Sequence, residues 1–209
     1  MTHYTSLDEV SAAITACNCA LCLTRTKPVP GEGNPHARVM FVGEAPGFHE
    51  DKEGRSLIGV AGQFLDEMLA SIYLKRSDIY LTNMVHSRPP GNRDPLPEEL
   101  DASWPYLAAQ IKLIDPKVIV TLGQFSKAKF VPDAGAISLV HGQAFIRPNP
   151  ATGAGEQWYV TLYHPAEGLH DASRKIVIEQ DFQVVRQALL AATAKTVFKT
   201  EHTKTQHIS

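Results

Sequence analysis

The sequence predicts an α/β fold in which four parallel strands alternate with helices. Four short runs rich in apolar and β-branched residues predict buried strands, and they span 39–42, 79–82, 118–122 and 158–162. The segments between the first three runs carry apolar residues at helical spacing. Each run stops where glycine, proline or a polar side chain begins a turn. Strands that alternate with helices are typical of parallel sheets.

A chain of 209 residues suits one domain with a full hydrophobic core. We expect a single domain over 1–194 and a polar, disordered tail over 195–209. No apolar run is long enough to cross a bilayer and the N-terminus does not resemble a leader, so we expect a cytoplasmic protein that does not bind membranes. We also expect a monomer. The net charge of −2 excludes a uniformly basic nucleic-acid binder but is compatible with a local basic face.

Helices are expected before, between and after the strands. They span about 7–22, 61–72, 97–113, a short stretch around Lys127 and Lys129, and 173–192. The helix over 97–113 has the clearest start signal, because Pro97 falls near its first position and two acidic residues follow in its first turn. Residues 142–146 can form a hairpin arm beside the fourth strand, joined to it through the loop over 149–155.

Each predicted strand ends beside a residue that can hydrogen-bond or titrate. These residues are Glu44, Asn83, Gln124 and His164. A lone residue of any of these types more often has a structural or solvated role. However, the carboxyl ends of parallel strands meet at one edge of the sheet, which is where open α/β sheets bind ligands. The matching positions therefore favour a site built from a carboxylate, an amide and an imidazole.

The loop after Asn83 is stiffened by prolines and glycines over 89–97 and displays Arg88 and Arg93. A rigid loop with two arginines suits phosphate contact. A surface connection whose arginines are only solvated fits the pattern equally well.

The three cysteines all lie within 17–22. Their odd number and crowding do not suit a disulfide framework. Thiolates at CxC and CxxC spacing can share one metal, but a closed tetrahedral site needs a fourth ligand, which a histidine would have to supply. Three reduced thiols near a helix are the simpler interpretation of the spacing.

Several stretches, in this order, resemble motifs of the uracil-DNA glycosylase superfamily. They are Gly43-Glu-Ala-Pro-Gly47 with 50–51 and 54–55, Thr82-Asn83 with Arg88-Pro-Pro-Gly-Asn-Arg93, and His164-Pro-Ala166. The sequence is most similar to family four, the iron–sulfur type, from about Cys17 to the last helix. The resemblance implies a three-layer α/β/α sandwich with a central four-stranded parallel sheet. It also implies an enzyme of base excision repair that flips deoxyuridine out of DNA and hydrolyses its N-glycosidic bond, with uracil-containing DNA as its partner.

The resemblance further implies roles for individual residues. Asn83 would read the Watson–Crick edge of uracil, His164 would donate to O2 of the departing base, and Glu44 would position water or face the sugar cation. Gly43, Ala45, Leu57 and Phe48 would complete the base pocket; Arg88, Arg93 and Lys127 would hold phosphates; and Leu169 would be the wedge inserted into the base stack.

The sequence also departs from the family pattern. Leu57 stands where the family has an aromatic ring that stacks on uracil, and Phe48 is the candidate replacement. Ala45 stands where another branch has a water-activating aspartate. Glu167 places a negative charge in a loop that should meet DNA.

The iron–sulfur ligand set is incomplete in this sequence. The resemblance aligns the early cysteine pair with Ala16 and Cys19, and the two later ligands with Ser87 and Ser103. We therefore expect no metal or cofactor, since a [4Fe–4S] cluster would require a site rebuilt from other residues. The possible remnant ligands are Cys17, Cys19, Cys22 and His86.

Two function classes follow. One is a monofunctional DNA glycosylase, favoured by the joint presence of Glu44, Asn83 and His164. The other is a DNA-binding or base-sensing relative with weak or altered activity, favoured by Leu57 and the missing cysteines. A nucleotide-binding α/β protein is disfavoured, because no glycine-rich phosphate loop follows any strand.

Overall fold

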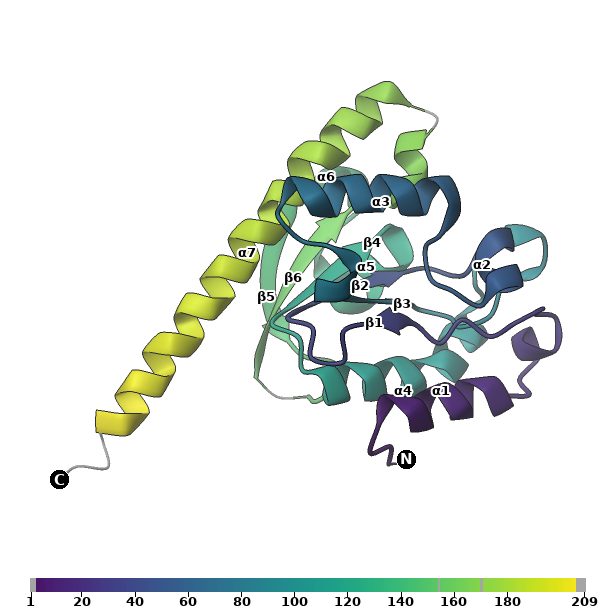
Figure 1. Ribbon diagram of the computed structural model, residues 1–209, viewed down its shortest axis with the longest axis horizontal. Coiled ribbons are helices and arrows are strands. Elements are labelled where there is room, and N and C mark those ends of the chain that lie inside the picture. Colours follow the sequence, from purple (N-terminus) through teal and green to yellow (C-terminus); the bar gives the residue numbers. More distant parts are fainter. Residues whose placement is uncertain (1–2, 154, 170, 206–209) are drawn as a thin grey trace.

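A mixed six-stranded sheet runs through the middle of the computed structural model, which describes residues 3–153, 155–169 and 171–205 (Figure 1). The strands are β1 (Glu32–Gly33), β2 (Val39–Gly43), β3 (Ile79–Asn83), β4 (Val118–Leu122), β5 (Gln143–Pro148) and β6 (Glu156–Leu162). Their order across the sheet is β1-β3-β2-β4-β6-β5. Strand β2 pairs in parallel with β3 and β4, and β4 pairs in parallel with β6. Strands β1 and β5 pair antiparallel at the two edges.

The predicted α/β class is confirmed, but the sheet is mixed and has six strands rather than four. Edge strand β5 is the hairpin arm expected around 142–146, and it pairs with β6. Edge strand β1 was missed because it has only two residues. Gly33 allows this pairing, since a Cβ at that position would lie 2.1 Å from the Ile79 carbonyl oxygen.

Most of the described helices lie at or near the predicted positions. They are α1 (Leu7–Ala16), α2 (Phe48–Glu53), α3 (Gly59–Ser71), α4 (Pro97–Ile114), α5 (Gln124–Phe130), α6 (Ile137–Val140) and α7 (Ala172–Thr205), with short 3-10 turns at η1 (Leu21–Leu23), η2 (Arg76–Asp78), η3 (Pro90–Asn92), η4 (Pro132–Ala134) and η5 (Pro165–Leu169). Helix α1 ends before Cys17, whose backbone is extended (φ −60°, ψ 134°). Helix α2 was not predicted, and it ends at Gly54 in the left-handed region (φ 74°).

Helix α7 continues to Thr205, past the predicted end at about residue 192. Figure 1 shows its last turns running beyond the edge of the sheet. Residues 206–209 of the predicted tail lie outside the described residues, and the domain boundary at residue 194 stays a prediction. None of the described helices is long and apolar enough to cross a membrane.

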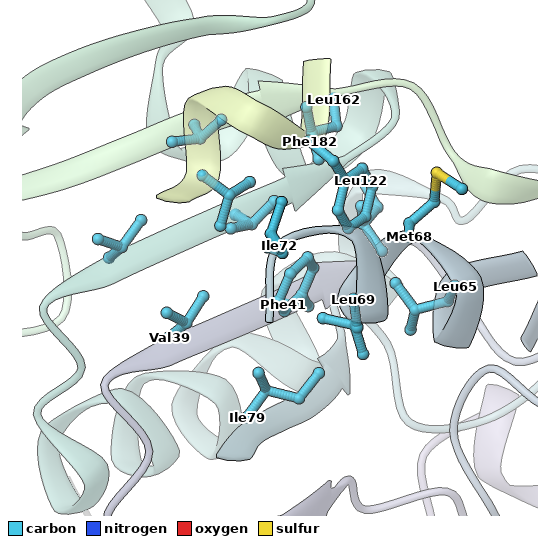
Figure 2. Packing of buried hydrophobic residues seen from close by; sticks show 14 of the residues in the cluster. Val39, Phe41, Leu65, Met68, Leu69, Ile72, Ile79, Leu122, Leu162 and Phe182 are labelled. Carbon is cyan, nitrogen blue, oxygen red and sulfur yellow. The ribbon is translucent and has the colours of Figure 1, made fainter. Parts of the chain in front are cut away.

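Helices α3 and α7 cover one face of the sheet. Leu65, Met68 and Leu69 of α3 pack over Phe41 of β2 (Figure 2). Phe182 of α7 stacks on Phe41 with ring centroids 6.0 Å apart. Burying a side chain of this size contributes roughly 1.5–3 kcal/mol relative to leaving it exposed. The apolar residues whose spacing predicted the helix over 61–72 therefore form the face of α3 that packs against the sheet.

Helices α4 and α5 cover the opposite face, and α1 packs against α4. Leu107 and Ile111 of α4 and Phe130 of α5 belong to the same buried cluster as Met40 and Tyr159 of the sheet. Apolar side chains therefore alternate between the two faces along β2, with Met40 on one side and Phe41 on the other. Helices cover both faces of the sheet, so the edge at the carboxyl ends of the parallel strands is the part of the sheet that can bind a ligand.

Candidate active site

A cavity of about 250 Å³ opens at the carboxyl ends of β2, β3 and β6. Glu44, Asn83 and His164, each at a strand end, all line it. The other lining residues come from the turn after β2, the start of α3, the loop after β3 and the turn after β6: Ala45, Pro46, Gly47, Glu50, Leu57, Ala61, Pro89, Asn92, Arg93 and Ala166. The fourth strand-end residue, Gln124, does not line the cavity, because its side chain accepts a hydrogen bond from the backbone N–H of Ile137 (2.9 Å).

Asn83 is held at the inner end of the cavity, directly beside Gly43. The two residues are register partners in the β2–β3 pair, and Asn83 is only 4% exposed. A Cβ at Gly43 would lie 2.4 Å from Asn83 Oδ1, which is closer than atoms can approach. Gly43 therefore leaves the space that the Asn83 amide occupies.

His164 is neutral and has a defined tautomer. Its Nδ1 accepts a hydrogen bond from the backbone N–H of Ala166 (3.2 Å), so the ring proton is on Nε2. Burial lowers the pKa of His164 to about 4. The backbone N–H of His164 also donates to a carboxylate oxygen of Glu167 (3.1 Å). Glu167 therefore anchors this turn, a role that its charge alone did not suggest.

Glu44 is partly buried on the turn after β2. Burial raises the pKa of its carboxyl to about 7, and the nearby charge of Asp94 acts in the same direction. A carboxyl with a pKa near neutrality can accept a proton at physiological pH. The Glu44 carboxyl can therefore gain or lose a proton near physiological pH.

Leu57 forms a wall of the cavity in an unusual backbone conformation. Its φ is +47°, in the left-handed region that side chains with a Cβ rarely adopt. Arg76 holds the turn by donating to the Leu57 carbonyl oxygen (2.6 Å), and Glu50 accepts from the next backbone N–H, that of Ile58 (2.9 Å). The side chain is only 8% exposed.

Phe48 does not replace the missing aromatic wall. It is not among the residues that line the cavity and is 56% exposed at the start of α2. The guanidinium of Arg88 lies over its ring, 5.2 Å from the centroid. The expected substitution of Phe48 for a stacking aromatic is therefore not supported by its position.

The two loop arginines have different environments. Arg93 forms two hydrogen bonds to the Glu99 carboxylate (2.9 and 2.6 Å), and these bonds hold the pKa of Glu99 below its ordinary value. Glu99 also accepts from the backbone N–H of Leu96 at the start of α4 (2.8 Å). Arg88 donates to the side chain of Asn92 (2.6 Å). Arg93 therefore joins the loop to α4, while Arg88 lies half-buried against Asn92 and the Phe48 ring.

The expected phosphate contact by Lys127 is wrong. Its side chain is 2% exposed, and its ammonium donates to the carbonyl oxygen of Gly135. The family resemblance implied this contact, but Lys127 lies on the inner face of α5. Leu169 by contrast is 36% exposed in η5, five residues after His164.

Similarity to known proteins identifies the family. The family model described as the uracil DNA glycosylase superfamily matches residues 30–199. The chain belongs to the uracil-DNA glycosylase superfamily. It is 41% identical over 196 residues to the type-4 uracil-DNA glycosylase of Sulfurisphaera tokodaii, covering 91% of this chain and 87% of that protein. It is also 41% identical over 191 residues to the type-4 enzyme of Archaeoglobus fulgidus (86% and 92% covered) and over 177 residues to that of Thermotoga maritima (83% and 90% covered). The predicted resemblance to family four is confirmed.

This member of the superfamily gathers three thiols beside the loop after β3. The sulfur atoms of Cys17, Cys19 and Cys22 all lie within 4.8 Å of one another. Cys19 and Cys22 are 2.9 Å apart, and the Ser87 hydroxyl lies 3.6 Å from the Cys22 sulfur. A group of this kind is a candidate metal site, so the expectation of no metal or cofactor is not supported.

The expectation that His86 is a remnant ligand is not supported by its position. His86 is not one of the groups within 4.8 Å of the thiols. Its ring is 3% exposed, and burial lowers its pKa to about 4. Among the described residues its Nδ1 has no hydrogen-bond partner, while Nε2 lies 3.5 Å from the Thr82 hydroxyl.

Sequence reasoning missed several residues that shape the cavity. Glu50 and Asn92 line it, although the sequence motifs had assigned them no role. Arg76 supports it from outside by holding the Leu57 turn. The sequence carried only a weak signal for these residues. Glu50 follows Gly47, the N-cap of α2, by three residues, which is the spacing of a helix cap. Arg76 lies in a segment with no recognisable pattern.

Proposed function

We propose that the protein is a monofunctional uracil-DNA glycosylase that takes a flipped deoxyuridine into the cavity and hydrolyses its N-glycosidic bond. The observation that carries the proposal is the convergence of Glu44, Asn83 and His164 on one small cavity. Its volume of about 250 Å³ is below the roughly 300–1,000 Å³ usual for drug-sized ligands, which suits a single base. A base can reach such a cavity only after it leaves the stack.

Asn83 would select uracil. A side-chain amide offers both a donor and an acceptor, so it can donate to uracil O4 and accept from N3–H. Cytosine presents an amino donor and an unprotonated ring nitrogen at these positions, so the same amide would face mismatched groups. Because Gly43 fixes the room around the amide, the selection would depend on both residues.

His164 would stabilise the leaving group. As the bond between C1′ and N1 breaks, its electron pair goes to the uracil ring and negative charge grows on O2. A neutral imidazole with its proton on Nε2 can donate a hydrogen bond to that oxygen without losing a charge of its own. The low pKa of His164 keeps the ring in this form over the whole physiological range.

Glu44 would act on the sugar side. Once ionised, its carboxylate can hold the attacking water and accept its proton while facing the positive charge that develops at C1′. Water oxygen then bonds to C1′, which leaves an abasic site and a uracil anion that takes up a proton. Burial sets the pKa of this carboxyl near neutrality.

DNA contacts are proposed for three surface residues. Leu169 would enter the gap left by the flipped base, since it is exposed in the turn that follows His164. Arg88 would hold a phosphate from the loop after β3, and Arg93 would contribute mainly by holding that loop to α4. We also propose that the protein acts as a cytoplasmic monomer on uracil-containing DNA.

The [4Fe–4S] cluster that the family-four resemblance implies does not fit the donor set. Such a cluster takes four ligands, and each binds a different iron. The described chain gathers three thiols in one group, and serine stands at both later ligand positions, Ser87 and Ser103. The proposed reaction needs only protein side chains and water.

The test is excision from end-labelled oligonucleotides that carry one uracil, in single-stranded and double-stranded form, followed by alkaline cleavage of the abasic site. We expect cleavage at uracil and none at cytosine or thymine in matched strands. Tight binding of uracil-DNA without cleavage would favour the alternative of a base-sensing relative, for which the aliphatic wall at Leu57 is the supporting observation. Equal cleavage of all three bases would contradict recognition by Asn83.

A further inference from the structure

We propose that Cys17, Cys19 and Cys22 form a three-thiolate site for a single soft metal ion, with Zn²⁺ as the expected occupant. The site lies where the end of α1, the turn η1 and the loop after β3 meet. It is separate from the base cavity, because none of the three cysteines lines that cavity. The proposal therefore stands or falls independently of glycosylase activity.

The spacing of the sulfur atoms favours one ion. Zn²⁺ bonds thiolates at about 2.3 Å, so two sulfur atoms on the same tetrahedral ion lie roughly 3.8 Å apart. The three sulfur atoms here are all within 4.8 Å of one another. In a cubane cluster each thiolate binds a different iron, which holds the sulfur atoms further apart. The 2.9 Å between the Cys19 and Cys22 sulfur atoms has to widen by about 1 Å for both to bind the same ion.

The Ser87 hydroxyl supports the thiols from outside. The Ser87 hydroxyl donates to the Cys22 sulfur (3.6 Å), and Ser87 in turn accepts from the guanidinium of Arg25 (3.1 Å). Outer partners of this kind orient metal ligands and stabilise their deprotonated form. The thiols are therefore half-buried, and a hydrogen-bonded Ser87–Arg25 pair supports the Cys22 sulfur.

The charge balance favours a divalent ion. Three thiolates and one Zn²⁺ carry a net charge of −1, and the guanidinium of Arg25 supplies the compensating positive charge. Arg25 is fixed in place because it also donates to the carbonyl oxygens of Ile14 (2.9 Å) and Thr15 (2.6 Å) at the end of α1. The remaining coordination position would face Ser87, and water can fill it, as in zinc sites with three protein ligands.

The first test measures metal in the full-length protein, purified under reducing conditions from zinc-supplemented cells. We expect one equivalent of zinc, no visible absorbance and no acid-labile sulfide. Chelation should lower Tm, and one equivalent of Zn²⁺ should restore it. Stoichiometric iron and sulfide after anaerobic purification would overturn the proposal, and so would a reduced protein that binds no zinc.

The second test assigns the ligands by titrating the metal-free protein with Co²⁺ and following the sulfur-to-cobalt charge-transfer band. Cys17→Ala, Cys19→Ala and Cys22→Ala should each weaken Zn²⁺ binding at least tenfold and reduce the band. Asn18→Ala, an exposed position between the first two cysteines, is the matched control and should leave binding unchanged. Ser87→Cys should add a fourth thiolate and tighten binding at least tenfold. Circular dichroism checks that each variant is folded, and parental affinity in Cys17→Ala would exclude the three-thiolate site.

Discussion

The backbone N–H of Ala166 donates to Nδ1 of His164 over 3.2 Å, so the ring proton of this neutral imidazole is on Nε2. The bond is local, because the two residues are two positions apart in the turn after β6. It fixes which nitrogen can donate to a ligand in the cavity before any ligand arrives. Pre-positioned donors of this kind cost no reorganisation during the reaction.

His164→Ala should reduce single-turnover excision of uracil by about 10²–10³-fold, because removal of one pre-positioned oxyanion donor has an effect of this order. Affinity for uracil-containing DNA should change little, since the phosphate contacts remain. Rapid-quench measurements of excision, with binding measured separately by fluorescence anisotropy, check both statements. Excision at the parental rate would exclude His164 as the donor to the leaving group.

Excision should rise with pH through about 7, because burial raises the pKa of Glu44 to about 7 and the ionised carboxylate is the active form. His164 does not titrate in this range, since its pKa is about 4. In Glu44→Gln the rise should disappear and the rate should be low at every pH. A parental pH profile in Glu44→Gln would assign the titration to another group.

The same carboxyl should affect stability with the opposite trend. Its pKa in the folded chain is above the ordinary value of 4.5, so the folded state binds this proton more tightly than the unfolded state. The resulting stabilisation is complete below about pH 4.5 and is lost as pH rises through 7. Glu44→Gln should therefore raise Tm relative to the parent at pH 8 but not at pH 4, as measured by thermal unfolding. A Tm difference that is the same at both values would contradict the raised pKa.

Arg88→Ala and Arg93→Ala should have separable effects. Among the described residues Arg88 bonds a neutral side chain, that of Asn92, so its charge can serve a phosphate and its loss should reduce the salt dependence of DNA binding by about one unit of slope. Arg93 is the partner of Glu99, which is 8% exposed, so its loss should lower Tm by leaving a nearly buried carboxylate unpaired. Binding measured at several salt concentrations and thermal unfolding of both variants distinguish the two roles. If Arg93→Ala changed only the salt slope, its ion pair would not be structural.

The parts of this protein that follow from local chemistry were predictable from sequence. The strands that carry Gly43, Asn83 and His164 have strong apolar runs, and parallel topology then brings their ends together. Lys127 shows the limit of this reasoning. Its position after β4 is visible in the sequence, but whether it faces solvent or the inside of α5 depends on how that helix docks.

Contacts between distant segments were also out of reach. The support of Leu57 by Arg76 joins positions 19 residues apart and depends on where η2 and the turn before α3 meet in space. The cysteines were visible as a group, yet their proximity to Ser87 depends on how the segment after α1 folds back onto the loop after β3. The spacing of residues along the chain does not predict such contacts.

Leu57→Phe should tighten binding of the flipped base. Stacking on an aromatic face contributes about 1–3 kcal/mol per base, and a leucine side chain retains only part of this. The change keeps the Leu57 backbone turn, which Arg76 holds through a carbonyl oxygen rather than through the side chain. KM for a uracil-containing oligonucleotide should fall, whereas Leu57→Ala should raise it. If Leu57→Phe folded normally but bound uracil-DNA less tightly, the wall at Leu57 would not be the stacking surface.

Gly43→Ala should impair base recognition without disturbing the fold. The added Cβ would lie 2.4 Å from Asn83 Oδ1, and the atom that must move is the end of a side chain rather than backbone. Gly43 has no positive φ, so alanine suits its strand conformation and Tm should change little. The displaced amide could no longer pair with both O4 and N3–H of uracil. We therefore expect Gly43→Ala to lose uracil excision to about the same extent as Asn83→Ala.

A double-mutant cycle tests whether Gly43 acts through Asn83. If it does, Gly43→Ala should have almost no further effect on excision in a chain that already carries Asn83→Ala, because the alanine side chain no longer occupies the space that the new Cβ enters. Additive losses in the double variant would mean that Gly43 contributes to excision by a route other than the position of the Asn83 amide.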